Sequence, residues 1–327
     1  MSSSVVLDFL IRNNLAISKE GSNNRSYKIT LNGDSLFLKT YFTHLMDNRS
    51  RLDAEWRFSQ FAYAITPESI PAPRSCDRED NLAVFKFVEG KSFEIETIGV
   101  DDVNQACDFF CQINTVDAKK RAYDIPVASE ACFSLEEHIR CVDDRVNQLY
   151  QIAEMSNENK KFKSILFQLN EKWIDIKRCI KKNKLYDQKN HIAESQRCVS
   201  PSDFGFHNAL KQSDGKIVFL DFEYAGWDDP AKMVCDFFSQ IAVPVPQTFF
   251  DNFVSRVMTV FPEKNELIDR ALLLRPVYLV KWFCIILNIF VPHHLHRRQF
   301  SNEKIDVLTL KNQQLQKAEM LLEKLYA

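Results

Sequence analysis

Two short segments in the second half of the chain, which combine acidic and other polar side chains with apolar ones, place the strongest constraint on the fold. The first is S-P-S-D-F-G-F-H-N-A-L at residues 200–210, and the second is L-D-F-E-Y-A-G at residues 220–226. Asp203 and Asn208 share the first segment, while Asp221 ends an apolar run in the second. An acid that emerges from a buried strand is costly unless it is paired or bound to a metal. The fold must therefore give these polar groups partners.

The three side chains have the chemistry that phosphoryl transfer needs. An aspartate that handles a hydroxyl proton, together with an asparagine and an aspartate that hold magnesium, is the minimal equipment of a kinase site. We therefore take Asp203 as the candidate catalytic residue, and Asn208 and Asp221 as candidate ligands of Mg²⁺. The alternative role of Asp203 is to cap a turn, which aspartate often does. Its place beside Asn208 and Asp221 favours the functional role.

The first forty residues supply candidates for a nucleotide site. Two β-rich runs joined by Asn32-Gly33 predict a tight hairpin. Ahead of the hairpin, Gly21, Ser22, Asn23 and Asn24 are expected to form a loop whose backbone N–H groups approach phosphate oxygens. Lys39, in the strand after the turn, is the natural partner of the nucleotide phosphates, although it also fits a solvent-facing strand position.

Two further segments extend the nucleotide site. Residues 51–62 have helical spacing, and Glu55 within them is placed to orient the lysine, as kinase lysines require. Residues 82–90 predict a buried strand that ends in a linker, where the backbone of Phe87 and Val88 is expected to bind an adenine edge. Because backbone groups can bind either adenine or guanine, the sequence does not decide between ATP and GTP.

In this order, the motifs resemble those of the aminoglycoside phosphotransferase and choline kinase family, which shares the protein-kinase-like fold. The family pattern H-x-D-x-x-x-x-N is met by P-S-D-F-G-F-H-N, and I-D-[FW]-E-Y-A-G-x-x-D-P is met by L-D-F-E-Y-A-G-W-D-D-P. The resemblance covers roughly residues 15–240. It implies an α+β fold of two lobes. Residues 1–88 would form a small, nucleotide-binding N-lobe with an antiparallel sheet and the hinge strand, and residues 89–327 a mainly helical lobe for catalysis and acceptor binding.

The resemblance also implies an activity. It is the ATP-dependent transfer of the γ-phosphoryl group to a hydroxyl of a small molecule, such as an amino-alcohol like choline, a sugar or an aminoglycoside, with ATP and Mg²⁺ as cofactors. Two departures keep an inactive kinase-like scaffold open as an alternative. Pro201 stands where the family has a histidine, and Gly205 stands where relatives often carry lysine or histidine. A kinase that acts on a macromolecule is the other alternative, although no activation-loop element follows Asp221.

The acceptor site is less well marked. Asp228 and Asp229 offer the beginning of an acidic pocket, and Tyr278 and Trp282, four residues apart, offer an aromatic wall suited to a quaternary ammonium group. Asp236 is expected to be structural and to tie its helix to the catalytic loop.

Composition narrows the class of protein. The chain has 327 residues and a net charge of −2, which gives no electrostatic reason to expect nucleic-acid binding. Nine dispersed cysteines, an odd number, are typical of reduced thiols, so we expect a cytoplasmic location. The most apolar stretch, residues 277–291, contains Lys281 and Asn288 and is shorter than the ~20 residues of a membrane helix. It predicts a buried core helix without membrane insertion, and the oligomeric state stays open.

Helical periodicity extends through much of the remaining chain. Residues 101–116 and 134–153 are expected to be helical. Six apolar residues then recur at helical spacing and predict an amphipathic helix; they are Phe162, Ile165, Leu169, Trp173, Ile176 and Ile180. The same periodicity over residues 305–326 predicts a C-terminal helix that packs through Ile305, Leu308, Leu315, Leu322 and Leu325.

Overall fold

The computed structural model describes residues 17–20, 24–31, 33–41, 49–155, 160–188, 191–301 and 306–326. The chain forms two compact units. The first is built mainly from Met1–Ser129 and Val199–Trp227, and the second mainly from Glu130–Cys198 and Asp228–Gln299. These units divide the chain at other points than residue 88, and the predicted lobe boundary stays a prediction.

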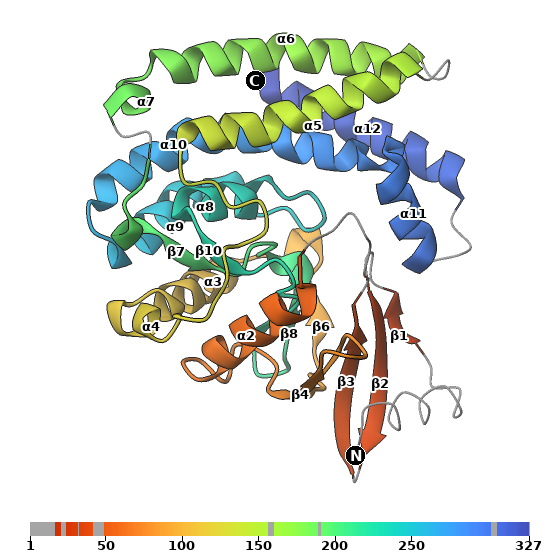
Figure 1. Cartoon of the computed structure of the whole chain (residues 1–327), viewed down its shortest axis with the longest axis vertical. Coiled ribbons are helices and arrows are strands. Elements are labelled where there is room, and N and C mark those ends of the chain that lie inside the picture. Colours follow the sequence, from red (N-terminus) through yellow and green to blue (C-terminus); the bar gives the residue numbers. More distant parts are fainter. Residues whose placement is uncertain are drawn as a thin grey trace. The chain divides into compact units, whose positions relative to one another are not determined.

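The first unit contains a five-stranded antiparallel sheet with the order β1-β2-β3-β5-β4 (Figure 1). Its strands are β1 (Ile17–Glu20), β2 (Arg25–Leu31), β3 (Asp34–Thr40), β4 (Pro73–Asp77) and β5 (Leu82–Lys86). The predicted hairpin is confirmed, because Leu31 pairs with Asp34 across a two-residue connection. Gly33 in this connection has a φ of +86°, which glycine adopts without steric penalty. The register of β3 against β5 sets Lys39 beside Ala83.

The helix α2 (Arg51–Tyr63) packs on this sheet. It begins after Ser50, whose side chain accepts a hydrogen bond from a backbone N–H of the first turn, as N-cap residues do. Leu52 is buried in one cluster with Phe85 of β5, so one face of the helix is fixed against the strands. Glu55 lies on the buried part of α2.

Short elements carry the segments that hold the acidic motifs. They are β6 (Lys91–Ser92), α3 (Val100–Ile113), α4 (Val116–Lys120), β7 (Cys198–Ser200), the short helix η3 (Phe206–Asn208), β8 (Ala209–Lys211), β9 (Ile217–Phe219) and β10 (Gly226–Asp228). The strands β6-β8-β9 form a three-stranded antiparallel sheet, and β10 pairs with β7. Asp203 and Asn208 therefore lie between β7 and β8, while Asp221 follows β9.

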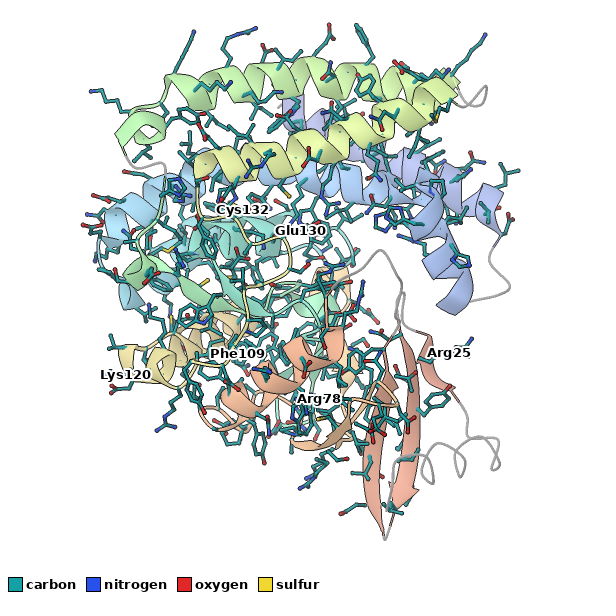
Figure 2. All side chains as sticks on the ribbon, viewed as in Figure 1. Arg25, Arg78, Phe109, Lys120, Glu130 and Cys132 are labelled. Carbon is teal, nitrogen blue, oxygen red and sulfur yellow. The ribbon has the colours of Figure 1, made fainter. Side chains whose placement is uncertain are left out.

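An aromatic cluster anchors the segment around Asp203. Its central residue is Phe109 of α3, which is labelled in Figure 2. The centroid of the Phe109 ring lies 5.7 Å from that of Phe204 and 4.9 Å from that of Phe219. Phe206, two residues beyond Phe204, is also buried. Because Phe204 and Phe206 are buried in the core, the positions of Asp203 before them and of His207 after them are restricted as well.

The second unit is helical. Its helices are α5 (Leu135–Met155), α6 (Lys160–Lys182), α7 (Lys184–Gln188), α8 (Pro230–Ser239), α9 (Phe250–Val257), α10 (Lys264–Ile286), α11 (Pro292–Ser301) and α12 (Val307–Tyr326). All six periodic apolar residues predicted for α6 are buried, which confirms that helix. In α12, Leu315, Leu322 and Leu325 are buried, but Leu308 is 71% exposed. The prediction that Leu308 packs in the core was therefore wrong; Ile305 lies outside the described residues.

The helix α10 forms the centre of the second unit and packs against α5, α8 and α12 (Figure 1). Its apolar stretch continues into the short helix η6 (Leu287–Phe290). Lys264–Phe290 is long enough to span a membrane, and its most apolar 18-residue stretch has a mean hydropathy of 1.7. Of this stretch, 56% is buried inside the structure. Val277, Val280 and Phe283 are wholly buried. The prediction of a buried core helix is confirmed.

Candidate functional site

Lys39 lies at the centre of a cluster of ionised side chains in the first unit. The strand β3 buries this residue to 5% exposure. Its Nζ lies 2.6 Å from Glu55 Oε2 and 2.5 Å from Asp221 Oδ1. Glu55 comes from α2, and Asp221 is separated from Lys39 by 182 positions in the sequence. The fold thus brings three of the expected site residues into direct contact, including the expected pair of Lys39 and Glu55.

Glu55 has further partners that hold its carboxylate in place. The hydroxyl of Tyr41 donates to Glu55 Oε2 over 2.8 Å, and the backbone N–H of Phe222 donates to Oε1 over 3.4 Å. We did not identify Tyr41 from the sequence. A signal was present, because Tyr41 follows Lys39 by two residues, and alternate residues of a strand share a face.

A second buried ion pair adjoins the first. Arg51 Nη1 lies 3.0 Å from Glu223 Oε1, and Asn24 Nδ2 donates to Glu223 Oε2 over 2.6 Å. Glu223 is therefore engaged in a buried salt bridge. Counted with Lys39, Glu55 and Asp221, the cluster holds two cations and three carboxylates. It therefore carries a surplus of one negative charge.

This surplus affects the protonation of the central groups. Burial disfavours the charged form of Lys39, but the carboxylates of Asp221 and Glu55 outweigh it and raise the pKa of Lys39 well above its usual value. Desolvation raises the pKa of Asp221, and Glu223 and Glu55 add to this rise against the opposing effect of Lys39. The Asp221 side chain is nevertheless 41% exposed, so it remains accessible to a ligand. A cation bound there would relieve the repulsion between the carboxylates.

The backbone is strained at two points of the site. Ser202 has a φ of +62° and Asp221 a φ of +66°, both in the left-handed region that is uncommon for residues other than glycine. Such conformations cluster at functional sites, where the surrounding structure maintains them. The backbone N–H of Leu220 donates to the carbonyl of Asn208 over 2.8 Å, which ties the segment before Asp221 to the one that follows Asp203.

The carboxylate of Asp203 is held on both oxygens. Asn208 Nδ2 lies 3.2 Å from Asp203 Oδ2 and also donates to the Asp203 carbonyl over 2.9 Å. His207 Nε2 lies 3.1 Å from Asp203 Oδ1. The Asp203 side chain is 36% exposed. The expected catalytic residue is therefore fixed in orientation but open on one side.

The segment that leads to Asp203 contains Pro201 and is braced from α3. Asn114, wholly buried at the end of α3, accepts a hydrogen bond from Val199 N–H over 2.8 Å and donates to Val199 C=O over 3.0 Å. One residue later, the Ser200 hydroxyl accepts from the N–H of Ser202 over 3.0 Å. No local pattern in the sequence points to Asn114, because its partner Val199 lies 85 positions away.

The other expected nucleotide-binding residues are only partly described. Gly21, Ser22 and Asn23 lie outside the described residues. The N–H of Phe87 donates to the carbonyl of Ser35 over 3.0 Å, so it is already engaged. Of the two linker residues, Val88 is therefore the better candidate to donate a backbone hydrogen bond to a base.

The residues fit a magnesium ion that is shared with a substrate. Among the described residues, no group of three or more His, Cys, Asp and Glu side chains is arranged to hold a metal. Magnesium commonly takes one or two protein oxygens and completes its shell with water and substrate phosphates. Asp221 offers an accessible carboxylate in a cluster of surplus negative charge. Asn208 offers Oδ1, because its hydrogen bonds to Asp203 use Nδ2.

The acidic residues considered for the acceptor site are buried in the second unit. Asp228 pairs with Lys232, and Asp229 lies 2.6 Å from Arg270 Nε and 3.1 Å from His138 Nε2. Both aspartates are 0% exposed. They do not form an open acidic pocket, because burial requires each charge to be paired.

The two aromatic residues considered for the acceptor are engaged within the second unit, Tyr278 as a buried residue and Trp282 as a half-buried one. Tyr278 is 2% exposed, and its hydroxyl lies 2.7 Å from His138 Nδ1. Trp282 Nε1 donates to Asp236 over 2.8 Å, and Lys281 Nζ lies 2.9 Å from the same carboxylate. Asp236 thus ties α8 to α10, which corrects the expectation that it ties its helix to the catalytic loop.

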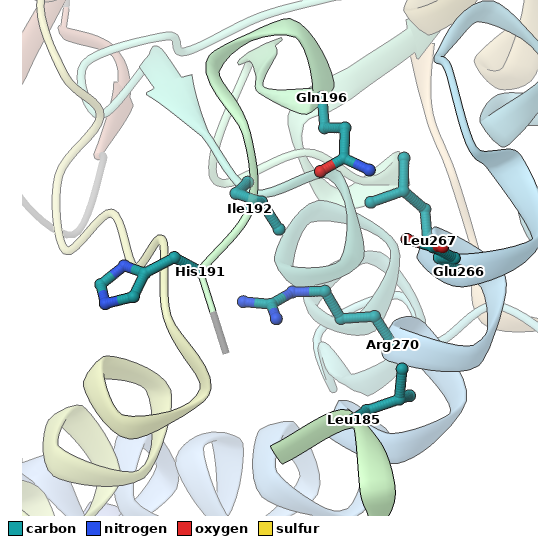
Figure 3. Close-up of a pocket in the computed structure, with 7 residues that line it drawn as sticks. All are labelled: Leu185, His191, Ile192, Gln196, Glu266, Leu267 and Arg270. Carbon is teal, nitrogen blue, oxygen red and sulfur yellow. The ribbon is translucent and has the colours of Figure 1, made fainter. Parts of the chain in front are cut away.

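The second unit has a small pocket of its own (Figure 3). It is lined by Leu185, His191, Ile192, Gln196, Glu266, Leu267 and Arg270. The guanidinium of Arg270 projects from α10 between the loop that carries His191 and the helix α7 (Figure 3). None of the residues expected at the phosphoryl-transfer site lines this pocket.

No protein-family model matches the sequence. No curated protein is similar to it in sequence.

Solved structures, by contrast, share its fold. The choline kinase of Cryptosporidium parvum superposes with a TM-score of 0.59 at 11% identity, and the alignment covers 100% of both chains. The ethanolamine kinase of Plasmodium vivax gives 0.56 at 14% identity over 93% of this chain and 81% of that one. A spectinomycin phosphotransferase in complex with ADP and spectinomycin gives 0.57 at 11% identity over 94% and 92%.

These likenesses establish the fold of the chain. The predicted α+β, protein-kinase-like fold, in the form found in choline kinases and aminoglycoside phosphotransferases, is confirmed. Because a fold hosts several activities, the function is argued from the site.

Proposed function

We propose that the chain is a magnesium-dependent phosphotransferase that moves the γ-phosphoryl group of ATP to a hydroxyl of a small molecule. One observation carries the proposal. Lys39 Nζ contacts both Glu55 and Asp221, while the Asp203 carboxylate is held by Asn208 and remains accessible on one side. This is the arrangement that phosphoryl transfer requires, because the catalyst has to position the phosphates and neutralise their charge.

The nature of the acceptor is proposed from the fold. Among its structural neighbours are enzymes named for choline, ethanolamine and spectinomycin, all of them small molecules with hydroxyl groups. The charge of Asp228 and Asp229 is already neutralised by Lys232 and Arg270. These two aspartates therefore do not favour a polycationic aminoglycoside over an amino-alcohol or a sugar.

Each residue of the site has a separate role in this reaction. Asp203 accepts a hydrogen bond from the acceptor hydroxyl and takes its proton as the new P–O bond forms and the bond to the β-phosphate oxygen breaks. Lys39, held by Glu55, binds the α- and β-phosphates and keeps them in line for this displacement. Asn208 and Asp221 would hold the magnesium, which neutralises charge on the phosphates when bound. The loop of Gly21, Ser22 and Asn23 would cover the phosphates with backbone N–H groups.

The test is magnesium-dependent consumption of ATP, and in parallel GTP, by the purified protein across a panel of amino-alcohols, sugars and aminoglycosides. We expect one acceptor class to stimulate turnover. We expect Asp203→Asn to retain nucleotide binding and to lower turnover by ~10²-fold or more, the order of effect expected for loss of a general base.

Two results would contradict the proposal. Undiminished turnover in Asp203→Asn would remove Asp203 from its role. Nucleotide binding without turnover on any acceptor would favour the alternative of an inactive kinase-like scaffold. His191→Ala, in the pocket of the second unit, serves as the matched control and should leave turnover unchanged.

A further inference from the structure

His207 occupies an unexpected place in the candidate site. It lies four residues after Asp203, and its Nε2 is 3.1 Å from Asp203 Oδ1. From its position in the sequence alone, His207 is equally compatible with an ordinary loop residue. The structure instead places the imidazole against the carboxylate that is expected to take the proton.

The local fold accounts for this placement. Phe204 and Phe206 are buried, and the Phe206 ring packs 4.8 Å from Phe93. The N–H of Asn208 donates to the carbonyl of Gly205 over 3.1 Å and closes the short turn that carries His207. Because both ends of this turn are fixed, the imidazole reaches Asp203 without a rearrangement of the backbone.

The hydrogen-bond chemistry fixes the tautomer of the ring. An ionised carboxylate accepts hydrogen bonds and donates none, so Nε2 must carry the proton. In the neutral ring, Nδ1 is then an acceptor. Within the described part of the chain, Nδ1 is buried and has no hydrogen-bond partner. A buried polar atom without a partner is unfavourable, so the packing of the ring alone does not explain its position, whereas the bond to Asp203 does.

We infer that His207 is a positioning residue that donates its Nε2 proton to Asp203 Oδ1 and fixes the carboxylate for the acceptor hydroxyl. The inference rests on the proposed function and deepens it. Asn208 holds Oδ2 and His207 holds Oδ1, so rotation of the carboxylate about its own axis is blocked from both sides.

The kinetic test compares His207→Ala, which removes the donor, with His207→Gln, which keeps an N–H donor. We expect His207→Ala to lower kcat ~10-fold while the KM for nucleotide stays nearly unchanged, because only orientation of the reacting group is lost. His207→Gln should recover most of this loss. His191→Ala is the matched control, since it removes a histidine that is exposed on the second unit.

A double-mutant cycle with Asp203→Asn tests whether the two residues act together. If His207 works through Asp203, His207→Ala should change kcat by less than ~2-fold in the Asp203→Asn background, because coupled residues are not additive. An unchanged kcat in His207→Ala, or an equal loss in both backgrounds, would overturn the inference.

A measurement without turnover separates this inference from the proposed function. Side-chain ¹H–¹⁵N spectra of the histidines, with His207 assigned through His207→Gln, should show the Nε2–H tautomer, and Asp203→Asn should shift its Nε2 resonance. A Nδ1–H tautomer, or a resonance that Asp203→Asn does not move, would overturn the hydrogen bond. If no acceptor supports turnover, the proposed function fails while this spectrum still decides the role of His207.

Discussion

Asp221 combines a left-handed backbone with a carboxylate that lies beside Glu55 and Glu223. A residue in such a conformation costs on the order of 1–3 kcal/mol and persists only where its surroundings maintain it. In this chain, the surroundings include the contact with Lys39 and the hydrogen bond from Leu220 to Asn208. This backbone conformation places the Asp221 carboxylate against Lys39. A cation bound to the nucleotide phosphates would be held by the carboxylate at this point.

The raised pKa of Asp221 predicts that magnesium binding depends on pH. Burial and the neighbouring carboxylates raise this pKa to about 7, and a metal binds the ionised form. Below this value, protons therefore compete with magnesium for the carboxylate. The affinity for magnesium should fall by up to ~10-fold as the pH drops from 7 to 6, and it should be nearly constant above pH 8. Calorimetric titration of magnesium into the nucleotide complex at pH 6, 7 and 8 measures the effect.

The control for this prediction is the same titration into nucleotide alone, which gives the contribution of the phosphate's own protonation. Asp214→Asn, at an exposed aspartate, should keep the pH dependence. An affinity that is flat between pH 6 and 8 after this subtraction would contradict the raised pKa.

At the scale of the secondary-structure elements, β7 depends on α3. A strand of three residues satisfies few of its own backbone groups, and Asn114 supplies both hydrogen bonds of Val199 from the end of α3. Because β7 leads directly to the Asp203 segment, the contact between Asn114 and Val199 affects both the stability of β7 and the position of Asp203. It also shows how the chain is braced where Pro201 offers no backbone N–H.

We predict that Asn114→Ala destabilises the protein by about 2 to 4 kcal/mol, because two buried backbone groups of Val199 lose their partners. Turnover should fall as well at temperatures where the variant is still folded. Denaturant unfolding and kinetics at low temperature measure the two effects. Gln112→Ala, on the exposed side of the same helix, should change stability by less than about 0.5 kcal/mol. Equal stability of the two variants would show that β7 is held by other contacts.

At the scale of the whole molecule, the net charge of −2 gives the protein no general attraction for an anionic nucleotide. Under the proposed function, nucleotide affinity would have to come from local groups, chiefly Lys39 and a bound magnesium ion. Yet the cluster around Lys39 has a surplus of negative charge. Nucleotide binding should therefore depend strictly on the cation, which turns a repulsive site into an attractive one.

This dependence predicts a change in global stability. Magnesium and ATP together should raise the melting temperature, by an amount equivalent to ~2.7 kcal/mol at 100 times the Kd, because a ligand of the native state stabilises it by mass action. ATP with a chelator should produce little shift. Asp221→Ala should abolish the shift while the unliganded protein still melts cooperatively. A similar shift without magnesium, or in Asp221→Ala, would contradict the role assigned to the cluster.

The sequence by itself determined the features that are local. The hairpin of β2 and β3, the helix α2, the amphipathic helix α6 and the buried helix α10 follow from turn residues and from the periods of strands and helices. The motifs around Asp203 and Asp221 were equally visible, because their residues are close in sequence. The exposed Leu308 of α12 is the exception, since periodicity cannot tell where a helix end extends beyond its neighbours.

Only the tertiary structure decided which distant groups meet. Lys39 and Asp221 are 182 positions apart, Arg51 and Glu223 172, and Asn114 and Val199 85. Such contacts depend on how whole elements pack, and no local pattern encodes them. For the same reason, Asp228 and Asp229 looked like accessible acids in the sequence but are buried and paired in the fold. A charge can be buried wherever packing delivers an opposite charge to it.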